Sequence, residues 1–213
     1  MRVMETSKVA LGMLGATGVT GGGGFAAYKM GVFSGEEKPL SVEQRLNNEE
    51  YELINSEDKR KEIFKDLKDK TEFLNELNKY KEGTDNLSDD NDGTKGGPAL
   101  KKMCDALLGS KEEQDFKNAS EWCVLRIQDR VLSNKSWIPL SGSEDHSSDW
   151  KASFTANQNA MVAYGVEGIQ TGMQADNGYT KVKEWCSKNA ILPINKSRKT
   201  LLEKASIWCT KNS

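Results

Sequence analysis

Four cysteines are the residues of this 213-residue sequence with the most informative chemistry and spacing. Two lie in each of the two repeat units described below, at Cys104 and Cys123 and at Cys186 and Cys209. An even number of cysteines in symmetric positions favours disulfides. Four cysteines allow three connectivities, and the sequence repeat described below favours Cys104–Cys123 with Cys186–Cys209. Four buried free thiols are the alternative. A four-cysteine zinc site is disfavoured, because zinc ligands usually come in closely spaced pairs, so we expect no bound metal.

The single histidine, His146, lies in the polar stretch Ser-Gly-Ser-Glu-Asp-His-Ser-Ser-Asp. Serine, histidine and aspartate are the residue types of a hydrolytic triad, but triads assemble side chains from separate elements of a fold. We therefore interpret this stretch as a solvated turn. Because no other catalytic motif stands out, we predict no catalytic residues and no enzymatic activity.

A glycine-rich stretch, Gly-Ala-Thr-Gly-Val-Thr-Gly at residues 15–21, resembles the phosphate-binding turn of dinucleotide-binding enzymes. That turn functions between a buried strand and a helix, with an acidic residue about twenty positions later for the ribose. Here a short apolar tail and a polar, helical segment follow instead. We expect no cofactor, and a nucleotide-binding enzyme that uses this turn is kept as the less favoured alternative.

The same glycines belong to an uncharged segment, residues 9–28, which has about the length that a helix needs to cross a bilayer. We predict that residues 1–33 form a signal anchor or a cleaved signal peptide, followed by a linker at 34–40. The charges around the segment favour an N-terminus inside and a body outside the cell. Gly12, Gly15 and Gly18 lie on one side of this helix, so it could pack against a second copy and form a homodimer.

The remainder of the chain repeats itself with an offset near 86 residues. The clearest match aligns Phe116-Lys-Asn-Ala-Ser-Glu-Trp-Cys123 with Leu202-Glu-Lys-Ala-Ser-Ile-Trp-Cys209. At the same offset Phe64 aligns with Trp150. Shorter matches at the starts of the copies pair residues 42–46 with 127–131, and residues 100–104 pair with 182–186. These matches predict two repeat units, at 41–124 and 126–210.

Within each unit the apolar spacing is helical. Ile63, Leu67, Leu74 and Leu77 fall on one stripe, which predicts an amphipathic helix, and each unit is expected to end in a helix that buries its last cysteine. Residues 83–98 contain turn-forming and acidic residues, so we predict an exposed, mobile loop there. A second glycine-bearing loop is expected at 165–178. The predicted fold class is therefore mainly α, with an N-terminal apolar segment before two tandem helical units that each contain a disulfide.

The formal net charge of −2, without a clustered basic face, argues against a nucleic-acid partner. We interpret the slight acidity of the body as a solvated surface.

These features together resemble the paralogous families of uncharacterised membrane-associated surface proteins of haemotropic mycoplasmas. The residues that carry the resemblance are Leu100, Lys101, Cys104, Trp122, Cys123, Cys186, Trp208 and Cys209. The resemblance implies a wall-less bacterium, a body held at the cell membrane, and a role in host interaction or antigenic variation, with a host surface protein or an antibody as partner. A protein secreted after signal cleavage is the alternative location, and a passive membrane-tethered structural protein is the alternative function.

Overall fold

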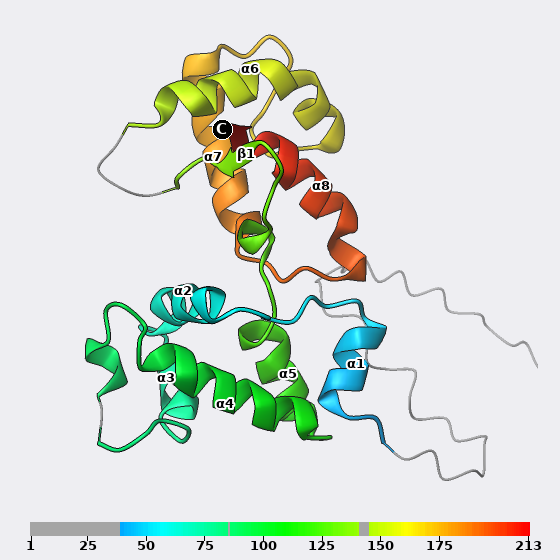
Figure 1. Cartoon of the computed structure of the whole chain (residues 1–213). Helices are drawn as coiled ribbons and strands as arrows, with labels where there is room; N and C mark the ends of the chain where they lie inside the picture. The colour runs from blue at the N-terminus through cyan, green and yellow to red at the C-terminus, as the bar shows by residue number, and fades with distance from the viewer. Residues whose placement is uncertain (1–38, 85, 141–144) are drawn as a thin grey trace, which may run out of the picture. The chain divides into compact units, whose positions relative to one another are not determined.

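The structure is a computed structural model, and it describes residues 39–84, 86–140 and 145–213. The chain divides into residues 1–38 and a compact unit of residues 39–213, and only the second is described here. The fold is mainly helical, as predicted (Figure 1). No helix in the described part of the chain is both long and apolar enough to cross a bilayer.

The first half of the compact unit contains five α-helices and one short 3-10 helix within its described residues. In chain order they are α1 (Val42–Asn48), α2 (Glu57–Leu67), α3 (Thr71–Leu77), η1 (Leu87–Asp89), α4 (Gly96–Gly109) and α5 (Glu113–Trp122). Helix α1 starts with a capping box, in which the Ser41 hydroxyl accepts from the Gln44 N–H and the Gln44 side chain accepts from the Ser41 N–H. Helices α2 and α4 lie side by side, and both contribute buried side chains to this half's core.

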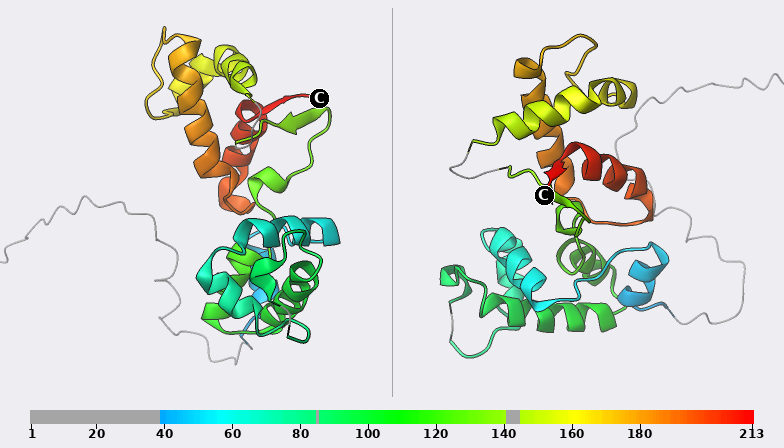
Figure 2. Two further views of the ribbon diagram at one scale, coloured as in Figure 1. Left: turned by 90° about the vertical axis from the view of Figure 1, so that its left-hand side faces the viewer. Right: turned by 45° about the horizontal axis from the view of Figure 1, so that its top comes forward.

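The second half consists of helices and one small antiparallel sheet. In chain order its elements are η2 (Ile127–Asp129), β1 (Lys135–Trp137), α6 (Ser147–Tyr164), α7 (Ala175–Ala190), η3 (Lys196–Arg198), α8 (Lys199–Trp208) and β2 (Thr210–Asn212). Strand β1 pairs with β2 so that Trp137 lies opposite Thr210. Helix α6 crosses α7, which is visible in the views of Figure 2.

Each half has its own apolar core. The first contains fully buried Phe64, Phe73 and Leu100, together with Trp122. The second is centred on Trp150 and Trp208, and both of these indole rings are about 1% exposed. Between these two separate clusters the halves are joined by ion pairs and by backbone hydrogen bonds, from the Leu125 N–H to the Glu52 carbonyl and from the Lys196 N–H to the Glu49 carbonyl.

Four backbone hydrogen bonds occur in matched pairs in the two halves. The Ile54 N–H donates to the Cys123 carbonyl at 3.1 Å, and the Ile138 N–H donates to the Cys209 carbonyl at 2.9 Å. In the same way, the N–H that opens α1, from Val42, donates to the Ser110 carbonyl, and the N–H that opens η2, from Ile127, donates to the Leu192 carbonyl. Each half therefore attaches its leading segment to its last helices through the same kind of bond.

A close contact between a glycine and a phenylalanine also recurs. A Cβ atom added to Gly96 would lie 2.4 Å from the Phe64 ring, and one added to Gly178 would lie 2.2 Å from the Phe154 ring. Only glycine lets the helix backbone approach the ring this closely. This recurring contact makes Phe154 the structural counterpart of Phe64 in the second half, whereas the sequence offset aligned Phe64 with Trp150.

The predicted continuous helix through Ile63 and Leu77 is wrong, because the chain breaks between α2 and α3. In one unbroken helix Phe64 and Phe73 would point to opposite sides, at 100° per residue. The break lets both rings be fully buried, and Phe73 packs edge-on against Trp122 with ring centroids 5.6 Å apart. Burial of two aromatic side chains thus outweighs helical continuity.

The loop predicted to be exposed and mobile at 83–98 is also different in the structure. Leu87 and Asp90 are buried there, at 1% and 7% exposure. The Asp90 carboxylate accepts hydrogen bonds from the backbone N–H groups of Gly93, Lys95 and Gly96, at 3.1, 3.0 and 2.7 Å. The carboxylate therefore caps the start of α4 and anchors the loop, a role that the acidic composition did not indicate.

Candidate functional site

Two disulfides connect the last helices of each half. Cys104 of α4 is bonded to Cys123 at the end of α5, and Cys186 of α7 is bonded to Cys209 at the end of α8. This is the pairing that the repeat favoured, and no cysteine is left as a free thiol. In the chain-entropy model, a disulfide that closes a loop of this length contributes about 3 kcal/mol to the free energy of unfolding. Cys123 and Cys209 are buried and cap their helices, one residue beyond the helical range.

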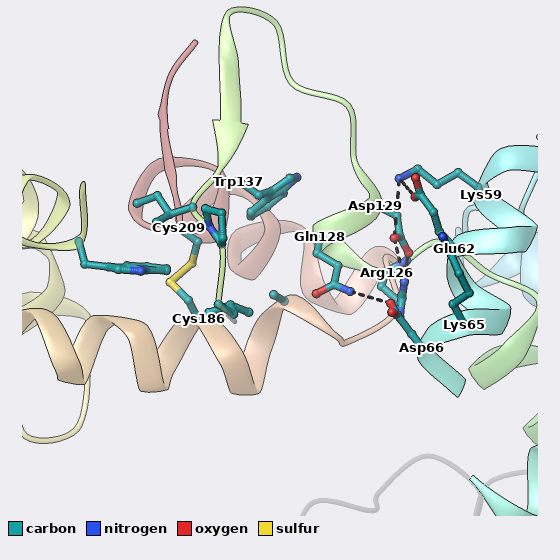
Figure 3. A pocket seen from close by; sticks show the side chains of 15 residues that line it. Lys59, Glu62, Lys65, Asp66, Arg126, Gln128, Asp129, Trp137, Cys186 and Cys209 are labelled. Atoms are coloured by element: carbon teal, nitrogen blue, oxygen red, sulfur yellow. Dashed lines mark hydrogen bonds and ion pairs between the residues drawn. A yellow bond between two sulfur atoms is a disulfide. The ribbon is translucent and has the colours of Figure 1, made fainter. Parts of the chain in front are cut away.

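A cavity of about 400 Å³ lies next to the second disulfide. It is lined by residues of α2, η2, β1, α6 and α7 and by the segment that follows β1. Figure 3 shows that its lining changes in character: Trp137 lies beside the disulfide, whereas Lys59, Glu62 and Arg126 gather at the other end. The volume is within the range of sites that hold small molecules.

The apolar end is formed mainly by residues 137–140, by Trp150 and by the Cys186–Cys209 disulfide. Its geometry is fixed by main-chain contacts. Strand β1 pairs with β2, Ile138 is bonded to the Cys209 carbonyl, and the Trp137 indole N–H donates to the Arg130 carbonyl at 3.1 Å. These contacts hold the backbone around the apolar surface in place.

The charged end is organised by Arg126. Its Nε donates to one Asp129 oxygen at 2.8 Å and its Nη2 to the other at 3.0 Å, while Nη1 lies 2.8 Å from Asp66 of α2. Burial opposes the charge of the guanidinium, but Asp129 and Asp66 outweigh that effect and raise the pKa of Arg126. Lys59 of α2 approaches Asp129 to 3.9 Å. The bidentate pair lies within the second half and fixes both side chains. The contacts Arg126–Asp66 and Lys59–Asp129 connect it to α2 of the first half.

Further ion pairs connect the same two halves. Arg130 contacts Glu52, Lys196 contacts Glu49, and Lys199 contacts Glu50. They follow from an uneven distribution of charge, since residues 39–124 contain 21 acidic and 14 basic residues and residues 125–213 contain 8 and 12. The contact between the halves is therefore electrostatically complementary.

One of the residues that line the cavity, Trp150, has a polar side-chain atom without a partner in the described part of the chain. The Trp150 indole N–H is closed to solvent and lies within hydrogen-bond distance of no acceptor among residues 39–84, 86–140 and 145–213. A buried donor without an acceptor costs about 1–3 kcal/mol, so native structures seldom leave one. It is the one such side-chain atom in the described residues.

The other chemically interesting clusters of the sequence make local contacts. The Ser147 hydroxyl donates to Asp145 at 3.0 Å, and His146 Nδ1 lies 3.4 Å from Asp149, which also pairs with Lys211. The serine and the histidine are therefore bonded to different carboxylates. This arrangement fits a turn at the start of α6.

The acidic loop before α4 is internally bonded as well. Hydrogen bonds from the Thr94 backbone N–H and from the Thr94 hydroxyl lower the pKa of Asp92 to about 2. Within the described residues, no group of three or more histidine, cysteine, aspartate or glutamate side chains could hold a metal ion.

Several sequence predictions concern residues outside the described ranges. They include the leader at 1–33, the membrane segment at 9–28, the glycine turn at 15–21, and the packing residues Gly12, Gly15 and Gly18. The structure adds two features that the sequence analysis did not identify, the Arg126–Asp129 pair and the cavity. The spacing of an arginine and an aspartate three residues apart was a local signal for the pair, but its burial depends on α2, which is remote in sequence.

Comparison of the chain with protein-family models, with curated proteins and with solved structures finds no match.

Proposed function

We propose that this chain is a surface-displayed interaction protein, exported to an oxidising compartment and tethered at the membrane of a wall-less bacterium. The observation that carries the proposal is the presence of one disulfide in each apolar core. Disulfides form and persist in oxidising compartments, whereas cytosolic thiols are kept reduced. The uncharged segment at 9–28 supplies a route of export that is consistent with this chemistry.

The body is further proposed to consist of two diverged copies of one helical unit, at 41–124 and 126–210. Matched contacts support this. Each half contains one disulfide between its last helices, one glycine packed against a phenylalanine ring, and one backbone bond to the carbonyl of its last cysteine. Duplication of a stapled unit provides a stable scaffold whose connecting loops are free to vary.

The loops that such a scaffold would display are attached at their bases. In the loop between α6 and α7, Val166 and Ile169 are buried, while Glu167 and Gln170 are exposed. The Gln158 side chain of α6 donates to the Gln170 and Met173 carbonyls, at 2.8 and 3.1 Å. A loop held in this way presents exposed side chains in a defined geometry, which lowers the entropic cost of binding a partner.

Thiol labelling of intact cells tests the proposal. Cells of a wall-less bacterium that express the full chain are treated with a membrane-impermeant maleimide, with and without prior reduction, and the mass of the purified chain is measured. We expect labelling only after reduction. A cytosolic protein with a reactive cysteine, probed in the same cells, controls for leakage.

Surface proteolysis of the same cells provides an independent readout, and we expect the body to be cleaved while the cells remain intact. Four free thiols that appear only after lysis, together with a body protected from protease, would place the protein inside the cell and refute the proposal.

A further inference from the structure

Trp150, whose buried indole N–H has no partner among the described residues, is one of the residues that line the cavity. The rest of the second core satisfies its polar groups. The Ser153 hydroxyl, one turn away on α6, donates to the Trp208 carbonyl at 2.5 Å, and the Trp137 N–H has its own carbonyl partner. A single unpartnered donor on a residue that lines a cavity indicates that its acceptor arrives with a bound molecule.

The surfaces around that donor determine what kind of molecule fits. Near the disulfide the wall presents the Trp137 ring, the side chains of residues 138–140 and the sulfur atoms of Cys186 and Cys209. These groups offer apolar contact and polarisable sulfur, which favour an aromatic or aliphatic body. An acceptor oxygen carried by such a body would satisfy the indole N–H.

The opposite end of the cavity favours a polar group on the bound molecule, but it does not favour a group of one particular charge. Its charged side chains comprise three cations and three anions, Lys59, Lys65, Arg126, Glu62, Asp66 and Asp129. Arg126 is already bonded to two carboxylates, and Lys59 to Glu62. A neutral or dipolar group therefore fits this end better than a strongly charged one.

We propose that this cavity binds a small amphipathic molecule, whose apolar body lies against the disulfide and Trp137 and whose oxygen acceptor accepts a hydrogen bond from Trp150. The polar end of the molecule faces the charged side chains of α2 and η2. Because the Trp150 N–H is closed to solvent, binding moves the neighbouring side chains apart by a small distance. This inference goes beyond the proposed surface display and does not depend on it.

Two fluorescent probes test the inference with the purified, oxidised full chain. The naphthyl ketone prodan has an apolar ring system and a carbonyl acceptor, and dimethylaminonaphthalene has the same ring system without the ketone. We expect prodan to bind with a blue-shifted emission, and Trp150→Phe to weaken its binding about fivefold, the value of one ordinary hydrogen bond. Binding of the probe without the ketone should be the same in both proteins.

Two further variants complete the design. Trp122→Phe removes an indole from the first core, outside the cavity, and should leave prodan binding unchanged. Ala190→Leu places a larger side chain on the cavity wall and should weaken binding of both probes at least tenfold, with the melting temperature measured to establish that the variant is folded. If Trp150→Phe does not fold, Ala190→Leu still tests occupancy of the cavity.

The indole ¹⁵N–¹H resonance of Trp150 gives a direct readout of the hydrogen bond. We expect this resonance to shift when prodan is added and to shift much less with dimethylaminonaphthalene. Three results would each overturn the inference. They are failure of prodan to bind the unmodified protein, equal prodan binding by Ala190→Leu and the unmodified protein, and an equal shift of the Trp150 resonance with prodan and with dimethylaminonaphthalene.

Discussion

Replacement of Arg126 by methionine should be among the most destabilising changes at the contact between the halves. The Arg126 side chain is 7% exposed and that of its partner Asp129 is 4% exposed, so the variant leaves a buried carboxylate without its cation. Removal of one partner of a buried pair costs about 3–5 kcal/mol. In the variant, Asp129 still accepts the hydrogen bond from the backbone N–H of residue 126 at 2.9 Å and still lies 3.9 Å from the Lys59 ammonium. The expected loss in the free energy of unfolding is therefore near the lower limit, about 3 kcal/mol.

The assay is equilibrium unfolding in urea, monitored by circular dichroism, for a double-mutant cycle of Arg126→Met and Asp129→Asn. We expect the double variant to be more stable than the sum of the single losses predicts, by about 2 kcal/mol, because the two changes remove the same interaction. Arg130→Met is the matched control. Its ion pair with Glu52 is 41% and 32% exposed, so its loss should stay below about 1 kcal/mol. Equal losses for the two arginine variants would refute the reasoning that burial gives the Arg126 pair its importance.

Three further predictions concern other parts of the fold. Gly178→Ala should lower the free energy of unfolding by about 2 kcal/mol, because its new Cβ would overlap a phenylalanine ring. Gly109→Ala, whose Cβ would meet no atom within 4 Å, should be neutral or slightly stabilising in the same urea titration. Replacement of both cysteines of either disulfide by alanine should cost about 3 kcal/mol, measured by calorimetry, and a difference of several kcal/mol between the two would contradict equal roles. Finally, the low pKa of Asp92 means that its hydrogen bonds stabilise the fold above the unfolded pKa of 3.8 and that this contribution is lost as the pH falls toward 2. Thr94→Val removes the hydroxyl but keeps the backbone N–H, so it should raise the pKa of Asp92 in a carbon-detected NMR titration, and an unchanged value would exclude the Thr94 hydroxyl as a cause.

The sequence alone was enough for features that depend on spacing within one segment or on similarity between two segments. The 3.6-residue period of apolar side chains predicted the helices that end at Cys123 and Cys209. The repeated Ala-Ser-x-Trp-Cys element favoured one disulfide connectivity out of three, because it predicted one bridge within each of two units. Such signals are local or internal to the chain, and they need no knowledge of how the elements pack.

Only the tertiary structure decided which local preferences were overridden. The stripe through Ile63 and Leu77 predicted one helix, but burial of both Phe64 and Phe73 required a break that no glycine or proline announces. The acidic loop contained no apolar pattern, yet Asp90 is held inside by three backbone N–H groups. In both cases the deciding contacts form only after the helices pack.

The candidate site could not be predicted for the same physical reason. The wall around Trp150 is assembled from α2, η2, β1, α6 and α7, which are remote from one another in the chain. An unpartnered indole N–H is a property of that assembly. In the sequence Trp150 is one of five tryptophans, and its alignment with Phe64 says nothing about hydrogen bonding. The sequence determined the helices and the covalent pairing, and the packing of distant segments determined where the cavity lies.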